Sequence, residues 1–196
     1  MAKNRGDQIL RDRLQFTIDA SGDLTTVYGR MDLSAFTGGK KGLAIKEVMF
    51  QLRDPAGSNT GVFSLVGDNL NASGSGPSQS SLKLFATTRA YENAADVGIA
   101  SPDVLCVEEQ QWILGSVDAA ISPESGYAQW DRHFYGPEDL HPEGFTVVSD
   151  LLIGIAFDNW NTQGEQTIEL DVLLIADEIT LTTERMNALY TQAQDL

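Results

Sequence analysis

Residues 145–181 read FTVVSDLLIGIAFDNWNTQGEQTIELDVLLIADEITL. They contain two long apolar runs rich in β-branched residues, 145–157 and 167–181, with the polar segment DNWNTQGEQ between them. Asn and Gly in that segment favour a reversal of the chain. The stretch therefore predicts two long antiparallel strands that form a hairpin at the centre of an all-β domain.

Shorter apolar runs, separated by turn-forming residues, fill the chain before this pair. Residues 14–18 and 24–29 flank a Ser-Gly-Asp turn signal and are predicted to form a hairpin. In the run 42–53 the alternation of apolar and polar residues breaks partway, which indicates a β-bulge or a change of face. Further strands are expected at 61–68, 81–91, 103–115 and, within the mostly irregular segment 116–144, at 127–134. Three Pro and three Gly disfavour a helix in that segment.

About eight strands joined by long connections, with almost no helix between them, predict an all-β fold. An eight-stranded jelly-roll β-sandwich suits this number of strands and the long loops, such as the Ser- and Gly-rich stretch 68–81. An immunoglobulin sandwich would require a Cys…Trp…Cys spacing that the sequence lacks. The expected organisation is a single jelly-roll domain over residues 14–181 between two terminal extensions.

The two extensions differ in character. Residues 1–13 are polar and are expected to form an N-terminal arm, whose cations Lys3, Arg5, Arg11 and Arg13 suit docking on the acidic body of a neighbouring chain. Residues 182–196 change to a helical period, and Thr182 or Thr183 is the expected N-cap of a short amphipathic helix. The predicted contact face of this helix consists of Met186, Leu189 and Tyr190.

The chain has 196 residues and a formal net charge of −15 that is unevenly distributed. Residues 1–53 carry +3, whereas residues 54–196 carry −18. An acidic body repels phosphate groups, so nucleic-acid binding over its surface is disfavoured and no sequence-specific contact is expected. A high-salt habitat is an alternative cause of such a surface. No secretory or membrane-spanning pattern is found in the sequence, and a soluble protein made in the cytosol is expected.

Few residues offer the chemistry of a metal site. Both histidines, His133 and His141, lie among carboxylates in WDRHFYGPEDLHPEG, and Asp158 follows the first apolar run of the central pair. Eight residues separate the histidines, so no regular element places them on one face, and the His-x-His pattern of the cupin metal site is absent. These three residues are the metal candidates. The favoured interpretation is a set of polar loops that need no metal and no cofactor.

Catalytic patterns are also missing from the sequence. It lacks a Gly-x-Ser-x-Gly elbow and a phosphate-binding loop. Cys106, the single cysteine, lies in an apolar run and is expected to be a small buried hydrophobe. No enzyme activity and no catalytic residue are predicted.

The three tryptophans suggest a different kind of site, because aromatic rings form stacking platforms for sugars. Trp112 lies within an apolar strand and is expected in the core. Trp130 and Trp160 are the surface candidates.

In organisation, residues 14–181 and their extensions resemble a small single jelly-roll viral capsid protein. The resemblance rests on the charged arm KNRGDQILRDR, the series of strands, the loops DNLNASGSGPSQSS and HFYGPEDLHPEG, and the C-terminal extension TTERMNALYTQAQDL. It implies a viral structural protein, made in the host cytoplasm, that self-assembles in many copies into an icosahedral shell and resides in the virion. Other capsid proteins are implied partners.

The arm departs from one pattern of this family. Coat proteins that package single-stranded genomes directly usually carry a long arm rich in Arg and Lys, and this arm is short with nearly balanced charges. The difference favours contact with an internal membrane, or packaging of the genome by another protein. The alternative function is a receptor- or carbohydrate-binding β-sandwich module, such as a viral spike or fibre domain, with Trp130 or Trp160 exposed at one end. A jelly-roll enzyme would need His133 and His141 to converge on a metal.

Overall fold

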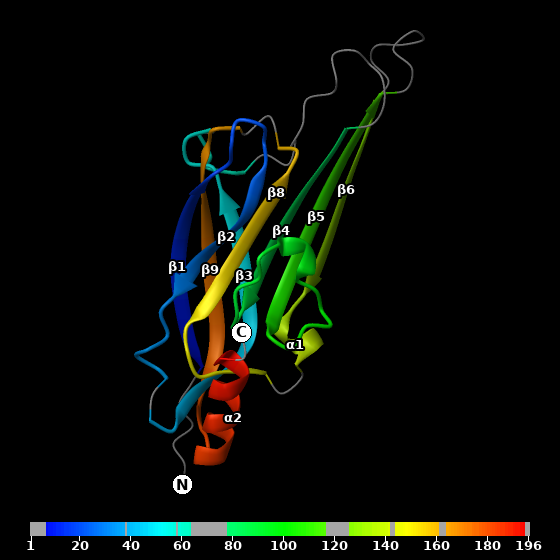
Figure 1. Cartoon of the computed structure of the whole chain (residues 1–196). Coiled ribbons are helices and arrows are strands. Elements are labelled where there is room, and N and C mark those ends of the chain that lie inside the picture. Colours follow the sequence, from blue (N-terminus) through cyan, green and yellow to red (C-terminus); the bar gives the residue numbers. More distant parts are fainter. Residues whose placement is uncertain are drawn as a thin grey trace.

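In the computed structural model, two antiparallel β-sheets pack face to face, which confirms the predicted all-β sandwich (Figure 1). The structure describes residues 7–37, 39–57, 59–63, 78–116, 126–141, 144–160 and 164–194. Its elements are, in chain order, β1 (Gln8–Thr17), β2 (Leu24–Met31), β3 (Lys41–Arg53), β4 (Ser78–Thr87), the 3-10 helix η1 (Ala94–Asp96), β5 (Val104–Ser116), β6 (Gly126–Tyr135), α1 (Pro137–Leu140), β7 (Phe145–Val147), β8 (Leu151–Asp158), β9 (Thr167–Thr180) and α2 (Thr183–Gln194).

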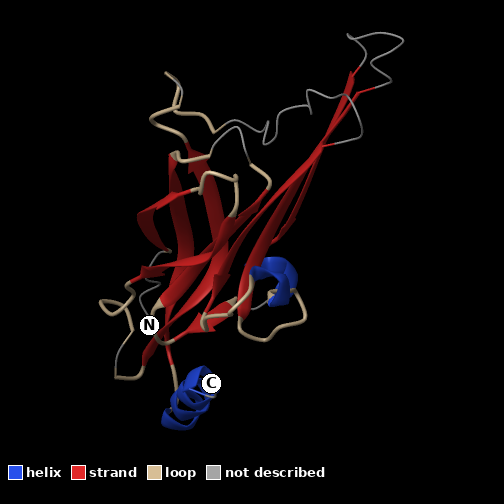
Figure 2. Cartoon of the chain, turned by 45° about the horizontal axis from the view of Figure 1, so that its top comes forward, coloured by secondary structure: helices blue, strands red, loops and turns tan. Residues whose placement is uncertain are grey.

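One sheet has four strands in the order β1-β9-β3-β7, and the other has five in the order β2-β8-β4-β5-β6. Only β4, β5 and β6 follow one another within a single sheet. At every other step from one strand to the next, the chain crosses to the opposite sheet. Figure 2 shows α2 at one end of the sandwich, whereas β5 and β6 extend beyond the other end.

The core lies between the two sheets, and the central strands β8 and β9 show why. In β9 every second side chain is buried, and in β8 the same alternation turns the large apolar side chains inward. Period-two burial of this kind places one face of each strand on the core. The buried side chains of the two strands are Leu151, Ile153, Ile155, Phe157, Ile168, Leu170, Val172, Leu174 and Ala176.

The predicted hairpin of residues 145–181 is wrong, although its strands exist. β8 pairs with β2 and β4, and β9 pairs with β1 and β3, so the two strands face each other across the core rather than share hydrogen bonds. The first apolar run is also divided between β7 in one sheet and β8 in the other. The chain crosses between the sheets at Val148–Asp150, where Asp150 accepts a hydrogen bond from the backbone N–H of Leu33 (3.3 Å).

The other strand predictions had mixed outcomes. The hairpin of residues 14–18 and 24–29 is wrong, because β1 and β2 lie in opposite sheets. The bulge in β3 is confirmed by a register shift between Ile45 and Glu47, after which Val48 turns inward. Residues 127–134 do form a strand, within β6. The segment 116–144 nevertheless contains one helical turn, α1, with Pro at its first position, where no backbone N–H is needed.

Several boundaries also differ from the predictions. The strand predicted at 81–91 is β4, Ser78–Thr87, so residues 78–81 of the predicted loop 68–81 belong to the sheet. β1 begins at Gln8, so residues 8–13 belong to the sheet and the predicted arm of residues 1–13 is too long. Of the strand predicted at 61–68, Val62 forms an isolated bridge with Arg53, and residues 64–68 lie outside the described residues.

Candidate interaction surfaces

The outer face of the four-stranded sheet carries a network of ion pairs near one end. Arg13 on β1 donates two hydrogen bonds to Asp171 on β9, from Nε to Oδ1 (2.6 Å) and from Nη2 to Oδ2 (3.2 Å). Arg53 on β3 donates from Nη1 to Glu169 Oε2 (3.0 Å). Hydrogen bonding to Arg13 holds the pKa of Asp171 below its ordinary value. The network joins three neighbouring strands.

The Arg13–Asp171 pair is predicted to make the stability of the fold depend on pH. Because folding lowers the pKa of Asp171, its contribution is fully present above the ordinary Asp value of about 3.9 and is lost as the pH falls through the folded-state pKa. Arg13→Gln should raise the pKa of Asp171 in an NMR titration of the carboxyl carbon. Arg11→Gln is the matched control, because Arg11 lies opposite Leu173 on β9. If Asp171 titrates alike in both variants, its pKa does not depend on Arg13.

Beside this network the same outer face becomes apolar. Ile9 on β1 is 51% exposed and Met49 on β3 is 50% exposed. Leu173 and Ile175 on β9 lie between them, because Ile9 is opposite Ile175 and Met49 is opposite Leu173. We call these four residues the apolar patch. A contiguous exposed apolar surface on a sheet face is typical of a contact with another protein.

The cations assigned to the N-terminal arm divide into two groups. Arg11 and Arg13 lie on β1 and point outward, so they belong to the surface of the sandwich and not to an arm. Arg13 is engaged by Asp171 within its own chain. Lys3 and Arg5 lie outside the described residues, and their predicted role stays a prediction.

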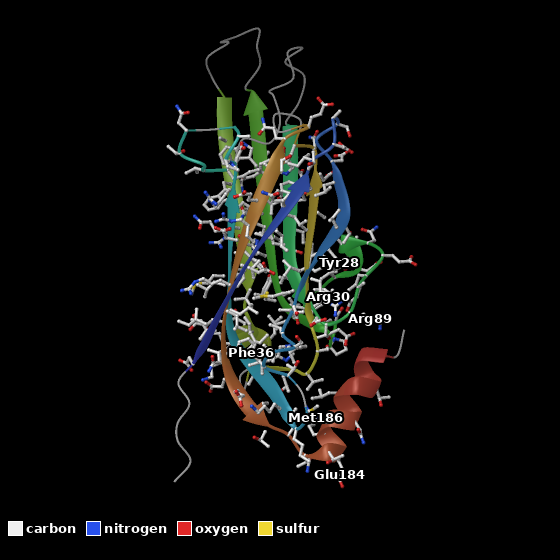
Figure 3. The ribbon with its side chains drawn as sticks, turned by 90° about the vertical axis from the view of Figure 1, so that its left-hand side faces the viewer. Tyr28, Arg30, Phe36, Arg89, Glu184 and Met186 are labelled. Atoms are coloured by element: carbon white, nitrogen blue, oxygen red, sulfur yellow. The ribbon has the colours of Figure 1, made fainter. Side chains whose placement is uncertain are left out.

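The C-terminal helix is confirmed, and Thr182 caps it by accepting a hydrogen bond at Oγ1 from the backbone N–H of Arg185 (3.2 Å). Met186 is buried within its own chain and is therefore not available as a contact residue. Leu189 is half-buried and lines a hollow of about 190 Å³ beside β7, together with Arg185 and His141. The side chain of Tyr190 lies outside the described side chains. Figure 3 labels Met186 and Glu184 near the start of α2.

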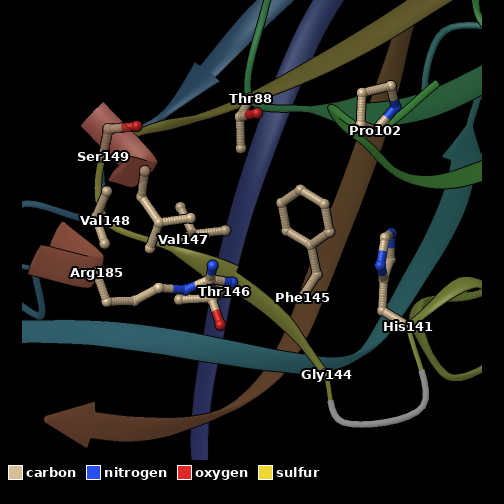
Figure 4. Close-up of a pocket in the computed structure, with 11 residues that line it drawn as sticks. Thr88, Pro102, His141, Gly144, Phe145, Thr146, Val147, Val148, Ser149 and Arg185 are labelled. Atoms are coloured by element: carbon tan, nitrogen blue, oxygen red, sulfur yellow. The ribbon is translucent and has the colours of Figure 1, made fainter. Parts of the chain in front are cut away.

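The two histidines lie in separate hollows of the surface. His141 lies after α1, its Nε2 is 3.2 Å from the carbonyl oxygen of Val104, and its ring packs edge-on against Phe145. Figure 4 shows the Phe145 ring between His141 and the guanidinium of Arg185. His133 lies on β6 and shares a shallow hollow on the outer face of the five-stranded sheet with Asp158. Among the described residues, no three His, Cys, Asp or Glu side chains are close enough to hold a metal ion.

Cys106 and the tryptophans can now be placed. Cys106 is fully buried, as predicted, and burial raises the pKa of its thiol. Trp160 is buried too, and its Nε1 donates to the carbonyl oxygen of Ser81 (2.7 Å), so its predicted place on the surface is wrong. Trp112 is half-buried rather than part of the core. Trp130, by contrast, is 47% exposed.

The feature that sequence reasoning missed is an ion pair beside Trp130. Glu108 on β5 is only 2% exposed, and Arg132 on β6 binds it through two hydrogen bonds, from Nε (2.7 Å) and Nη2 (3.0 Å). Gln110 donates to the same carboxylate (2.6 Å), while its own Oε1 is buried without a hydrogen-bond partner among the described residues. These residues line a hollow of about 280 Å³ between the sheets. In the sequence, Glu108 is one of the acidic residues of an apolar run, and the pattern does not identify it as buried.

The described helices include none long and apolar enough to cross a membrane. Comparison of the sequence with protein-family models and with curated proteins finds no match.

Proposed function

We propose that the chain is a jelly-roll capsid subunit that self-assembles into an icosahedral virus shell. The observation that carries the proposal is the order of the strands. Strands from the two ends of the domain pair successively, β1 with β9, β2 with β8 and β3 with β7, and β4 pairs with β5. Rolling one long antiparallel ribbon into a sandwich would produce this pattern, so the order of the strands supports a jelly roll. In this interpretation β6 is an additional strand at the edge of one sheet.

Two surface features support assembly in many copies. The apolar patch gives the outer face of the four-stranded sheet an area suited to protein contact. The opposite sheet extends beyond the sandwich through β5 and β6 (Figure 1). The proposal also includes manufacture in the host cytoplasm, residence in the virion, and contacts with other capsid proteins. Contact of the N-terminal residues with an internal membrane or the genome is part of the same proposal.

Assembly of the purified chain is the direct test. Analytical ultracentrifugation and negative-stain electron microscopy are expected to show uniform closed particles. Met49→Ser is expected to reduce the yield of particles several-fold, because it removes one of the two most exposed apolar side chains of the apolar patch.

Ile99→Ser is the matched control for this variant. Ile99 is exposed to a similar extent, at 53%, but it lies in a loop outside the sheets. It should therefore assemble like the wild type. A stable monomer or small oligomer at high concentration of the wild-type chain would overturn the capsid proposal.

Trp130 favours a second candidate function, a receptor- or carbohydrate-binding module of a viral spike or fibre. Its half-exposed ring lies at the hollow lined by Gln110 and Arg132, which offers one stacking surface beside polar groups. The burial of Trp160 removes the second ring that such a platform would use. Oligosaccharide binding that quenches tryptophan fluorescence in the wild type, but not in Trp130→Ala, would favour this alternative.

A further inference from the structure

The strand β6 is exposed to an unusual degree. Every residue from Ala128 to Phe134 is exposed, on both faces of the sheet. Among the described strands β6 hydrogen-bonds only to β5, so one of its edges is open. β4 accompanies β5 as far as Leu114, but β6 has a strand partner on one side only and buries little of its own surface. This edge of the sheet therefore lacks the burial that supports the rest of the sheet.

The outermost strands of the two sheets are not equally suited to pairing with another chain. β7 has only three residues, and β2 has an irregular register between Leu24 and Val27. Short strands and bulges are features that protect sheet edges from pairing. β6 has ten residues, a regular register against β5 and no proline. Unlike β6, β1 has every second side chain at least partly buried.

We propose that β6 is the edge through which two copies of this chain pair, antiparallel, so that their five-stranded sheets become one continuous sheet. The inference rests on the proposed self-assembly and names one of its contacts. Paired strands place residues of the same face opposite each other, so only registers that match odd with odd and even with even positions are allowed.

One allowed register is complementary in both polarity and shape. With the twofold axis at Arg132, Asp131 of each copy lies opposite His133 of the other, and Trp130 lies opposite Phe134. A carboxylate opposite an imidazole that can donate a hydrogen bond to it, and aromatic pairs at directly opposed positions, stabilise a sheet. Trp130 and Phe134 are 47% and 39% exposed in the single chain, and this contact covers them.

The central arginines do not oppose this register. The two Arg132 residues approach each other at the axis, but each is bound in two hydrogen bonds to the buried Glu108 of its own chain. Their positive charges are neutralised within each copy before the copies meet. By contrast, an axis at Asp131 would place two acidic side chains opposite each other, and an axis at His133 would pair histidine with histidine.

Cysteine pairing tests the register directly. A chain carrying Asp131→Cys, mixed with a chain carrying His133→Cys, is expected to form a disulfide-linked heterodimer under mild oxidation. Each variant alone should form little cross-linked product, because its two cysteines lie two positions apart along the paired strands, beyond the reach of a disulfide. Cys106, the only native cysteine, is buried and does not compete.

Charge reversal gives an independent measurement. His133→Glu should raise the dimer dissociation constant roughly tenfold, because it places like charges at two symmetric positions, and Asp131→Lys should raise it as well, because it removes the carboxylate that accepts from His133. The double variant should return it towards the wild-type value. Glu184→Lys, on an exposed residue of α2, is the matched control and should leave the dissociation constant unchanged.

The outcomes separate this inference from the proposed function. Particles that form without cross-linking of the mixed cysteine variants, or a double variant no tighter than the single ones, would overturn pairing through β6 and leave the capsid proposal standing. Cross-linked heterodimers without particles would support the pairing and count against the capsid. Cross-linking together with particles supports both.

Discussion

Arg132→Met is expected to lower the free energy of unfolding by about 3 kcal/mol, because it leaves a buried carboxylate without its cation. Glu108 is 2% exposed, and two of the three side-chain hydrogen bonds shown to reach it come from Arg132. The remaining donor, Gln110, is neutral and cannot balance the charge. Denaturant unfolding at pH 7, with the slope compared between variants, measures the loss.

The double variant Glu108→Met/Arg132→Met separates loss of the pair from loss of packing. Replacing both members of a buried ion pair by apolar side chains of similar size is often close to neutral, so most of the lost stability should return. Arg13→Met is the matched control, since its pair with Asp171 lies on the exposed face of the sheet and its removal should cost much less. If Arg132→Met unfolds at the wild-type midpoint, Glu108 does not require the cation.

The contact between Glu108 and Arg132 could not be predicted from the sequence. Glu108 and Arg132 are 24 positions apart, and their contact depends on the pairing of β5 with β6. The sequence places acidic residues in an apolar run but does not reveal which of them points inward. Glu108 and Glu109 are neighbours on a strand and so face opposite sides: one is buried and the other is exposed.

Local features of the strands were predictable for a physical reason. The bulge in β3 follows from the change of face between Ile45 and Val48, and the start of α2 follows from Thr182. Each of these features depends on only a few neighbouring residues. The choice of partner strand is not local. β8 and β9 each have two neighbours in their own sheet, and the apolar periodicity that identifies both strands is the same whether they pair or face each other.

The burial of single side chains could be predicted only in part. Trp160 lies in a polar segment and was expected at the surface, yet its indole N–H finds the carbonyl oxygen of Ser81 on β4. That partner is 79 positions away and exists only after β8 and β4 have paired. Neutral aromatic residues in polar segments can satisfy their one donor in this way, and the sequence does not distinguish them from exposed ones.

Gly154→Ala is expected to destabilise the fold by about 3 kcal/mol, because the new methyl group would enter the space of a buried ring. A Cβ at this central position of β8 would lie 2.1 Å from Cε2 and 2.2 Å from Cζ of Phe85. Phe85 is fully buried on the outer side of the sheet, packed with Val97 and edge-on against Tyr28, so the ring has little room to move. Thermal or denaturant unfolding would measure the loss.

Gly98→Ala is the matched control, because a Cβ there meets nothing within 4 Å, and its stability should change by less than about 0.5 kcal/mol. The double variant Gly154→Ala/Phe85→Leu should recover part of the loss if the clash with the ring is its cause. Equal unfolding midpoints for the two alanine variants would contradict this account. Close packing of the Phe85 ring on Gly154 would then not be important for the stability of the fold.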